Sequence, residues 1–243
     1  MASDFFDFKE FRVFHKQSAM KVGTDSVLLG CLAAVLMHDE HILDIGAGSG
    51  ILSLIIAQRS SAIIDAIEID ELAFQEASQN FQSSKWSNRL NAIHQSLQTF
   101  VIGSNKKYDC IVSNPPYFDT YANYSIANAQ RKLARQDANL PFEDLAKAVQ
   151  YLLSETGSFW LILPDLESKQ FEEIAKVNFL FMHTNIAIYP NAESPVRRRI
   201  QAYSKSALAI KEDQLILLDE HKEKTIRYQQ LTQAFYLDKL KSR

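Results

Sequence analysis

Four residues near the middle of the chain, Asn-Pro-Pro-Tyr at 114–117, could bind and orient a planar substrate that carries an NH2 group. They follow an apolar, β-branched run at residues 108–113, which predicts a buried parallel strand. The motif therefore lies at the carboxyl end of a strand, where open α/β sheets bind ligands. The Asn114 side-chain oxygen and the Pro115 carbonyl can each accept one N–H, and Tyr117 offers a ring for stacking. Adenine fits these groups, although the same residue types also form ordinary stiff turns.

A glycine-rich turn is the second segment with binding chemistry. Residues 41–45 predict a strand that runs directly into Gly-Ala-Gly-Ser-Gly, and the next residues have helical spacing. Alternate glycines let the backbone approach a ligand closely, but the spacing G-x-G-x-G differs from the dinucleotide fingerprint G-x-G-x-x-G. The glycines concerned are Gly46, Gly48 and Gly50.

Two acidic residues at neighbouring strand ends indicate which ligand this turn would take. Asp44 would repel a pyrophosphate, whereas it can accept a hydrogen bond from an ammonium group. Glu68 follows the next predicted strand, at residues 62–67, and can accept hydrogen bonds from both hydroxyls of a ribose. A nucleoside attached to an amino acid satisfies all of these groups, and S-adenosylmethionine is such a molecule.

Three further segments carry polar or helix-starting residues. The helix-like run at 27–37 is preceded by Thr24 and Asp25, either of which is a natural N-cap, and free N–H groups there could hold a carboxylate or a phosphate. The polar stretch 119–139 has the length of a functional loop or lid. It contains basic residues, and so does the segment 195–199, whose three arginines could clamp phosphates. Simple capping and solvated surface are the alternatives for these segments.

Composition places the chain among ordinary α/β proteins. With 243 residues, 47% hydrophobic and 23% charged, it can bury a full core as one domain, and strands alternating with helices predict a parallel sheet. The net charge of −3 argues against nonspecific coating of nucleic acid. Both cysteines lie in apolar contexts, and the histidines lack ligand spacing, so we expect no disulfide and no metal site. The chain has no long apolar run and no basic leader, so we expect a cytoplasmic protein that makes no membrane contact.

Taken together, the motifs resemble one enzyme family. The order Met-Lys-Val-Gly-Thr-Asp at 20–25, Asp-Ile-Gly-Ala-Gly-Ser-Gly at 44–50 and Asn-Pro-Pro-Tyr-Phe at 114–118 resembles the bacterial tRNA adenine-N6 methyltransferases that modify the adenosine beside the anticodon of valine tRNA. The likeness extends over most of the chain, including a Phe-rich N-terminal extension at about residues 1–20 and the basic segment near residue 197. The glycine turn and Asn-Pro-Pro-Tyr are typical of the wider class of S-adenosylmethionine-dependent methyltransferases. Within that class, Met-Lys-Val-Gly-Thr-Asp narrows the resemblance to this tRNA-modifying family.

The resemblance implies a fold, a reaction and a set of site residues. The fold would be a Rossmann-like class I methyltransferase of seven mostly parallel strands, with an antiparallel C-terminal hairpin and helices on both faces. The enzyme would be a monomer that binds the anticodon stem-loop and transfers a methyl group to adenosine 37 without a metal. Catalysis would use Asn114, Pro115 and Tyr117. The cofactor would be held by Lys21, Gly23, Thr24, Asp44, Gly46, Gly48, Gly50, Glu68, Ser96 and Asn114, and the RNA by Phe118, Arg131, Arg135, Arg197 and Arg198.

One departure from the family and three rival interpretations accompany this hypothesis. Related enzymes often carry an acid after the third strand that meets the cofactor's adenine, whereas this chain has Gln-Ser-Leu at 95–97, so Ser96 or a backbone carbonyl would replace it. A release-factor glutamine-N5 methyltransferase presents the same NH2 geometry, but that family carries a sizeable helical domain before its glycine turn, and only 43 residues precede Asp44 here. A DNA adenine-N6 methyltransferase usually needs a separate recognition domain. A noncatalytic RNA-binding module would have no use for two intact motifs.

Overall fold

The computed structural model describes residues 3–18, 21–115 and 140–237. Four predicted site residues lie outside these ranges, namely Tyr117, Phe118, Arg131 and Arg135. Within the described ranges, none of the helices combines the length and the apolar character needed to cross a membrane.

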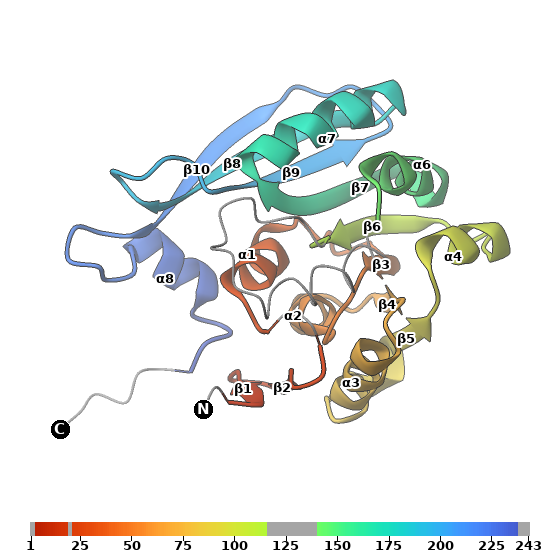
Figure 1. Ribbon diagram of the computed structural model, residues 1–243, viewed down its shortest axis with the longest axis horizontal. Coiled ribbons are helices and arrows are strands. Elements are labelled where there is room, and N and C mark those ends of the chain that lie inside the picture. Colours follow the sequence, from red (N-terminus) through yellow and green to blue (C-terminus); the bar gives the residue numbers. More distant parts are fainter. Residues whose placement is uncertain (1–2, 19–20, 116–139, 238–243) are drawn as a thin grey trace, which may run out of the picture.

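One eight-stranded sheet organises the chain, in the order β10-β8-β9-β7-β6-β3-β4-β5 (Figure 1). Strands β3 to β7 pair in parallel, β9 is antiparallel to both β7 and β8, and β10 is parallel to β8. This arrangement confirms the predicted fold class and adds one strand, β10, to the seven expected. The strands are β3 His41–Ile45, β4 Ile63–Glu68, β5 Leu90–His94, β6 Tyr108–Ser113, β7 Leu153–Pro164, β8 Phe181–Asn191, β9 Arg198–Ser204 and β10 Lys211–Leu218.

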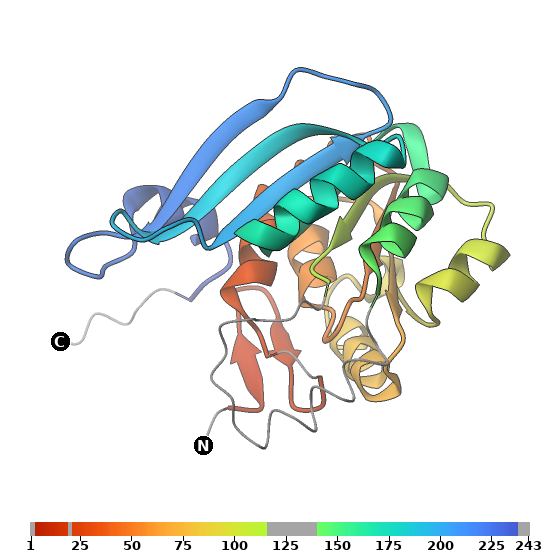
Figure 2. The same ribbon diagram turned by 45° about the horizontal axis from the view of Figure 1, so that its top comes forward.

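Helices cover both faces of the sheet (Figure 2). Because successive strand residues point to opposite faces, Ile42 enters one core and Leu43 the other. Burial on both faces explains why the parallel strands read as continuous apolar runs. One core is completed by α1 Thr24–Leu32, α2 Ile51–Arg59, α3 Glu71–Gln82 and α8 Ile226–Thr232, and the other by α4 Leu97–Gly103, α6 Phe142–Leu152 and α7 Asp165–Val177.

Helix α1 differs from the sequence-based expectation at both ends. Its N-cap is Gly23, which has extended backbone and makes no side-chain cap, so the assignment of Thr24 or Asp25 as N-cap is wrong. The helix ends at Leu32 instead of residue 37, where Ala33 leaves the helical conformation and the Arg59 guanidinium donates to the carbonyls of Gly30 and Ala33. Charged donors commonly satisfy the unpaired carbonyls at a helix C-terminus.

The Phe-rich N-terminus forms a separate two-stranded antiparallel sheet, β1 Phe5–Asp7 and β2 Arg12–Phe14. Its aromatic rings pack with the other end of the described chain, since Phe8 stacks on Tyr236 with centroids 5.9 Å apart. The Lys9 N–H also donates to the Phe235 carbonyl at 2.8 Å. The N-terminal hairpin and the segment after α8 therefore pack against each other.

Candidate active site

The carboxyl ends of three adjacent strands bring the two sequence motifs together. Strand β3 lies between β4 and β6, with Asp44 opposite Ala66 on one side and Val112 on the other. The glycine turn follows β3, Glu68 ends β4, and Asn114 follows β6. Sequence reasoning predicted this meeting point from the rule that ligands bind at the carboxyl edge of parallel strands.

The glycine turn has a backbone that other residues rarely adopt. Gly46, Gly48 and Gly50 have φ of +74°, +55° and +78°. A Cβ atom on Gly46 or Gly48 would meet nothing within 4 Å, so the turn faces open space, whereas a Cβ on Gly50 would overlap the Phe81 ring. The first two glycines therefore form a shallow cradle for a ligand, and Gly50 is needed for the packing of α2 against α3.

Glu68 holds this turn in place. Its Oε2 accepts the Gly48 N–H at 2.8 Å, and its Oε1 accepts the N–H groups of Ile69 and Asp70, both at 2.9 Å. A carboxylate has about four lone-pair positions, so three backbone donors leave about one for a ligand. Glu68 thus supports the cofactor turn directly, and its contact with both ribose hydroxyls stays a prediction.

Asp44 carries a buried oxygen without a partner. The residue is 1% exposed, and its Oδ2 accepts from the Ser53 hydroxyl at 2.7 Å. Its Oδ1 is buried and has no hydrogen bond to any described residue. Burial raises the pKa of the Asp44 carboxyl to about 7, against the opposing effect of the Ser53 hydrogen bond. Such a carboxyl is poised to ionise when a cationic group arrives.

Asn114 has the same feature at the next strand end. It is 9% exposed, its Nδ2 donates to the Ser26 hydroxyl at 2.9 Å, and its Oδ1 is buried without a partner in the described part of the chain. Pro115, the next residue, is buried. Two unpaired acceptors, on Asp44 and Asn114, thus lie at adjacent strand ends, and buried acceptors are normally satisfied in folded proteins. A ligand with N–H donors would satisfy both.

A cleft of about 360 Å³ adjoins Asn114 and extends to the C-terminal part of the sheet. Three predicted cofactor contacts, Lys21, Gly23 and Thr24, line this cleft together with Arg197 and Arg198. Lys21 donates through Nζ to the His15 carbonyl at 2.8 Å. The structure thus groups the start of α1 with the basic segment before β9, at the side of Asn114 away from the glycine turn.

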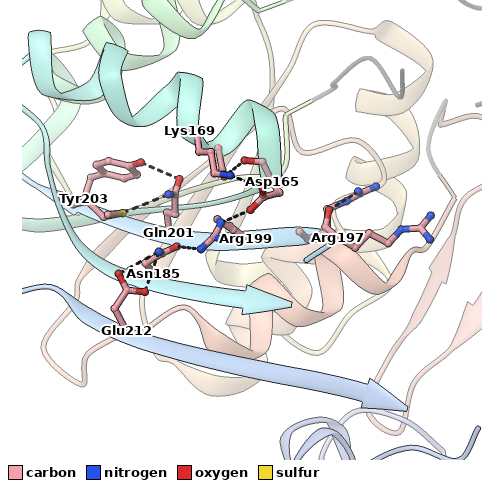
Figure 3. A network of polar contacts seen from close by, with 11 residues as sticks. Asp165, Lys169, Asn185, Arg197, Arg199, Gln201, Tyr203 and Glu212 are labelled. Carbon is pink, nitrogen blue, oxygen red and sulfur yellow. Dashed lines mark hydrogen bonds and ion pairs between the residues drawn. The ribbon is translucent and has the colours of Figure 1, made fainter. Parts of the chain in front are cut away.

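The three arginines of that segment have different surroundings. Arg197 is exposed at the cleft. The Arg198 Nε pairs with Asp25 Oδ2 at 2.9 Å, and its side chain is 13% exposed. Arg199 lies between Asp165, at 2.5 Å, and Asn185, at 3.3 Å, inside a polar network of α7 and β8 (Figure 3). Arg199 therefore stabilises the sheet through its ion pair with Asp165, and a phosphate contact by this residue stays a prediction.

Ser96 is an N-cap. Its hydroxyl accepts the Thr99 N–H at 3.1 Å and bonds to the Thr99 hydroxyl at 2.9 Å, which starts α4 directly after β5. The capping role was not foreseen, and the predicted contact with the cofactor's adenine stays a prediction.

Sequence reasoning missed three residues that support the site. Ser26 bonds to Asn114 and Ser53 bonds to Asp44. The Asn80 Nδ2 donates to the backbone carbonyls of Ser49, in the glycine turn, and of Phe14, at 2.8 Å each. A signal was available for Ser53, because it is the one polar residue in the run Ile-Leu-Ser-Leu-Ile-Ile. Ser26 and Asn80 had no comparable signal, since their partners lie 88 and 31 residues away.

Comparisons with known proteins identify relatives over nearly the whole chain. The family model "methyltransferase small domain" matches residues 11–164. A protein of Flavobacterium psychrophilum named tRNA1(Val) (adenine(37)-N6)-methyltransferase is 40% identical over 96% of this chain and 99% of its own length. A protein of the same name from Bacteroides fragilis is 37% identical over 98% and 99%.

Solved structures show the same fold at low sequence identity. A predicted O-methyltransferase from Agrobacterium tumefaciens has a TM-score of 0.68 at 16% identity, covering 87% of this chain and 96% of that one. A Thermus thermophilus 16S rRNA N2 G1207 methyltransferase, solved with AdoMet and guanosine, has a TM-score of 0.55 at 18% identity, covering 81% and 47%. At these identities the likeness concerns the fold alone.

Proposed function

We propose that this chain, which belongs to the tRNA1(Val) (adenine(37)-N6)-methyltransferase family, methylates N6 of adenosine 37 in a valine tRNA with S-adenosylmethionine as methyl donor. We further propose that it acts as one domain, as a cytoplasmic monomer and without a metal ion. In the described residues, no group of three His, Cys, Asp or Glu side chains could hold a metal.

The buried, unpaired Oδ1 of Asn114 is the observation that carries this proposal. An exocyclic adenine amine is a poor nucleophile because its lone pair is delocalised into the ring. If Asn114 Oδ1 and the Pro115 carbonyl accept its two hydrogens, the nitrogen is held toward a tetrahedral shape with the lone pair directed at the methyl group. The gain comes from orientation and from dipoles placed where positive charge develops. Methyl transfer would give a positively charged methylammonium, which is acidic enough to lose its proton to water, so no strong base is required.

The cofactor's fit is supported by the residues beside the glycine turn. S-adenosylmethionine supplies an electrophilic methyl group when bound. Open space at Gly46 and Gly48 leaves room for a ligand, the unpaired Asp44 oxygen suits its ammonium group, and Glu68, which holds the turn, would accept from its ribose. Lys21, Gly23 and Thr24 would contact the amino-acid end from the other side, and Ser96 would contact the cofactor's adenine.

The RNA would approach across the cleft beside Asn114. Adenosine 37 must leave its stack to reach a buried amide oxygen, and Tyr117 and Phe118 would hold the base by stacking, a contact worth roughly 1–3 kcal/mol per base. Arg197 and Lys21 are exposed cations at this cleft, and Arg197 is proposed to contact phosphate together with Arg131 and Arg135. Arg198 would have to share its charge between phosphate and Asp25.

Methyl transfer from labelled S-adenosylmethionine to three acceptors tests the proposal. Valine tRNA that lacks the modification should be labelled on N6 of adenosine 37, and the same tRNA with guanosine at position 37 should not. Release factor and duplex DNA should remain unlabelled at equal concentration. Label in release factor with none in tRNA would support the glutamine alternative and overturn the proposal.

A further inference from the structure

The hydrogen bond between Ser26 and Asn114 joins the start of α1 to the reactive strand end. We infer that Ser26 is a positioning residue, which fixes the orientation of the Asn114 amide so that its oxygen faces the substrate amine. The inference rests on the proposed function, because it assigns a role for that same site. The distance from Asn114 Nδ2 to Ser26 Oγ is 2.9 Å, and Asn114 Oδ1 is the end of the amide left unpaired.

The two ends of an Asn side chain have opposite hydrogen-bonding character. The oxygen accepts, whereas the nitrogen only donates. A substrate NH2 group also donates, so an amide rotated by 180° would set two donors against each other and leave the amine unoriented. With the oxygen facing the substrate, the amide nitrogen must face Ser26, and the serine hydroxyl is able to accept from it. The substrate's N–H donors select this orientation, and the Ser26 hydroxyl stabilises it by accepting from the amide nitrogen.

The fold holds Ser26 firmly in this place. Ser26 is in the first turn of α1 and is followed by Val27 and Leu28, which are 0% and 1% exposed. On its other side, Asp25 pairs with Arg198 at 2.9 Å, which ties the same turn to β9. Sheet and core thus fix the hydroxyl, and the amide adjusts to it.

Alanine at position 26 would leave the Asn114 nitrogen without its acceptor. A net hydrogen-bond contribution of the usual size corresponds to a loss of about 3- to 10-fold in the single-turnover rate. Affinities for S-adenosylmethionine and for tRNA should stay within about twofold, because Ser26 acts through Asn114 on the reacting geometry. Ser26→Thr keeps a hydroxyl and should recover most of the rate. Ser60→Ala, at the end of α2, is the matched control and should behave as wild type.

A double-mutant cycle separates positioning from a merely structural role. In an Asn114→Asp background both side-chain oxygens accept, so orientation no longer matters and Ser26→Ala should cost less than about twofold. The inference is overturned if Ser26→Ala keeps the wild-type rate, if Ser26→Thr fails to recover it, or if the loss is equally large in the Asn114→Asp background. If the Asn114→Asp enzyme is too slow to measure, recovery of the rate by Ser26→Thr is the test of the inference. Failure of wild-type enzyme to methylate tRNA would instead refute the proposed function.

Discussion

Binding of S-adenosylmethionine should tighten about sixfold between pH 6.0 and pH 7.5, if Asp44 accepts a hydrogen bond from its ammonium group. Burial raises the pKa of Asp44 to about 7 in the free protein, so the carboxyl is mostly neutral at pH 6. A neutral carboxyl attracts a cation weakly, and binding at pH 6 must therefore first release a proton.

The magnitude follows from the ionised fraction of Asp44. With a pKa of about 7 this fraction rises from about 0.09 at pH 6.0 to about 0.76 at pH 7.5, a factor of about eight. An α-ammonium with a pKa near 7.8 loses about a third of its charge over the same interval, which reduces the factor to about six. Asp44→Asn cannot ionise, so its affinity should be weaker at pH 7.5 than wild type and should change less than about twofold with pH.

Isothermal titration calorimetry in two buffers of different ionisation enthalpy measures both quantities. Wild type should release close to one proton for each S-adenosylmethionine bound at pH 6 and close to none at pH 7.5, and Asp44→Asn should release none. The stability of the free protein gives an independent check. Because the folded-state pKa lies above the unfolded value of 3.8, the neutral carboxyl favours folding below about pH 4, and this contribution is lost as pH rises through 7. Equal affinity at both pH values, with no proton release, would refute the reasoning about Asp44.

Three other variants test separate parts of the site. Gly50→Ala should lower the melting temperature by several degrees, because alanine at positive φ costs roughly 1–2 kcal/mol and the added Cβ would overlap the Phe81 ring. Gly103→Ala is the control and should leave the melting temperature unchanged, because a Cβ at that position meets no atom within 4 Å. Glu68→Ala should weaken binding of S-adenosylmethionine at least about tenfold in calorimetry, because the variant loses a charged acceptor for the ribose and for the glycine turn. An unchanged affinity would show that Glu68 does not contribute to cofactor binding. Arg197→Ala should lower the slope of log affinity for tRNA against log salt concentration by about one. Arg198→Ala should lower it by less, because Asp25 already neutralises Arg198. Equal slopes in wild type and Arg197→Ala would show that Arg197 makes no phosphate contact.

The sequence predicted the framework of the site because its signals are local. A strand followed by alternate glycines, and a strand followed by Asn-Pro-Pro-Tyr, each place a motif at the carboxyl edge of the sheet. The contacts of Asp44 and Asn114 with Ser53 and Ser26 depend on how helices pack across the sheet. Such packing is determined by the whole core, so no short window of sequence reveals it.

Strand β10 and the roles of the arginines were hidden for a related reason. Residues 211–218 carry mixed charged and apolar residues, as suits an edge strand that pairs on one side, and this pattern is weaker than that of the buried strands. The run of three arginines reads as one basic patch, yet Asp25 and Asp165 come from distant segments and neutralise two of them. The three consecutive arginines therefore carry less free positive charge at the surface than the sequence suggests.

The single-turnover rate of Asn114→Ala on valine tRNA, with enzyme and S-adenosylmethionine saturating, tests the central claim most directly. Asn114 Oδ1 is proposed to contact the amine only in the reacting geometry, so its loss should appear in the chemical step and not in ground-state affinity. A preorganised electrostatic contact of this kind is worth about 10²- to 10³-fold in rate. We predict a decrease in that range, with the dissociation constants for S-adenosylmethionine and tRNA nearly unchanged. A variant that keeps more than about a tenth of the wild-type rate, well outside that range, would show that residues 114–117 form only a structural turn.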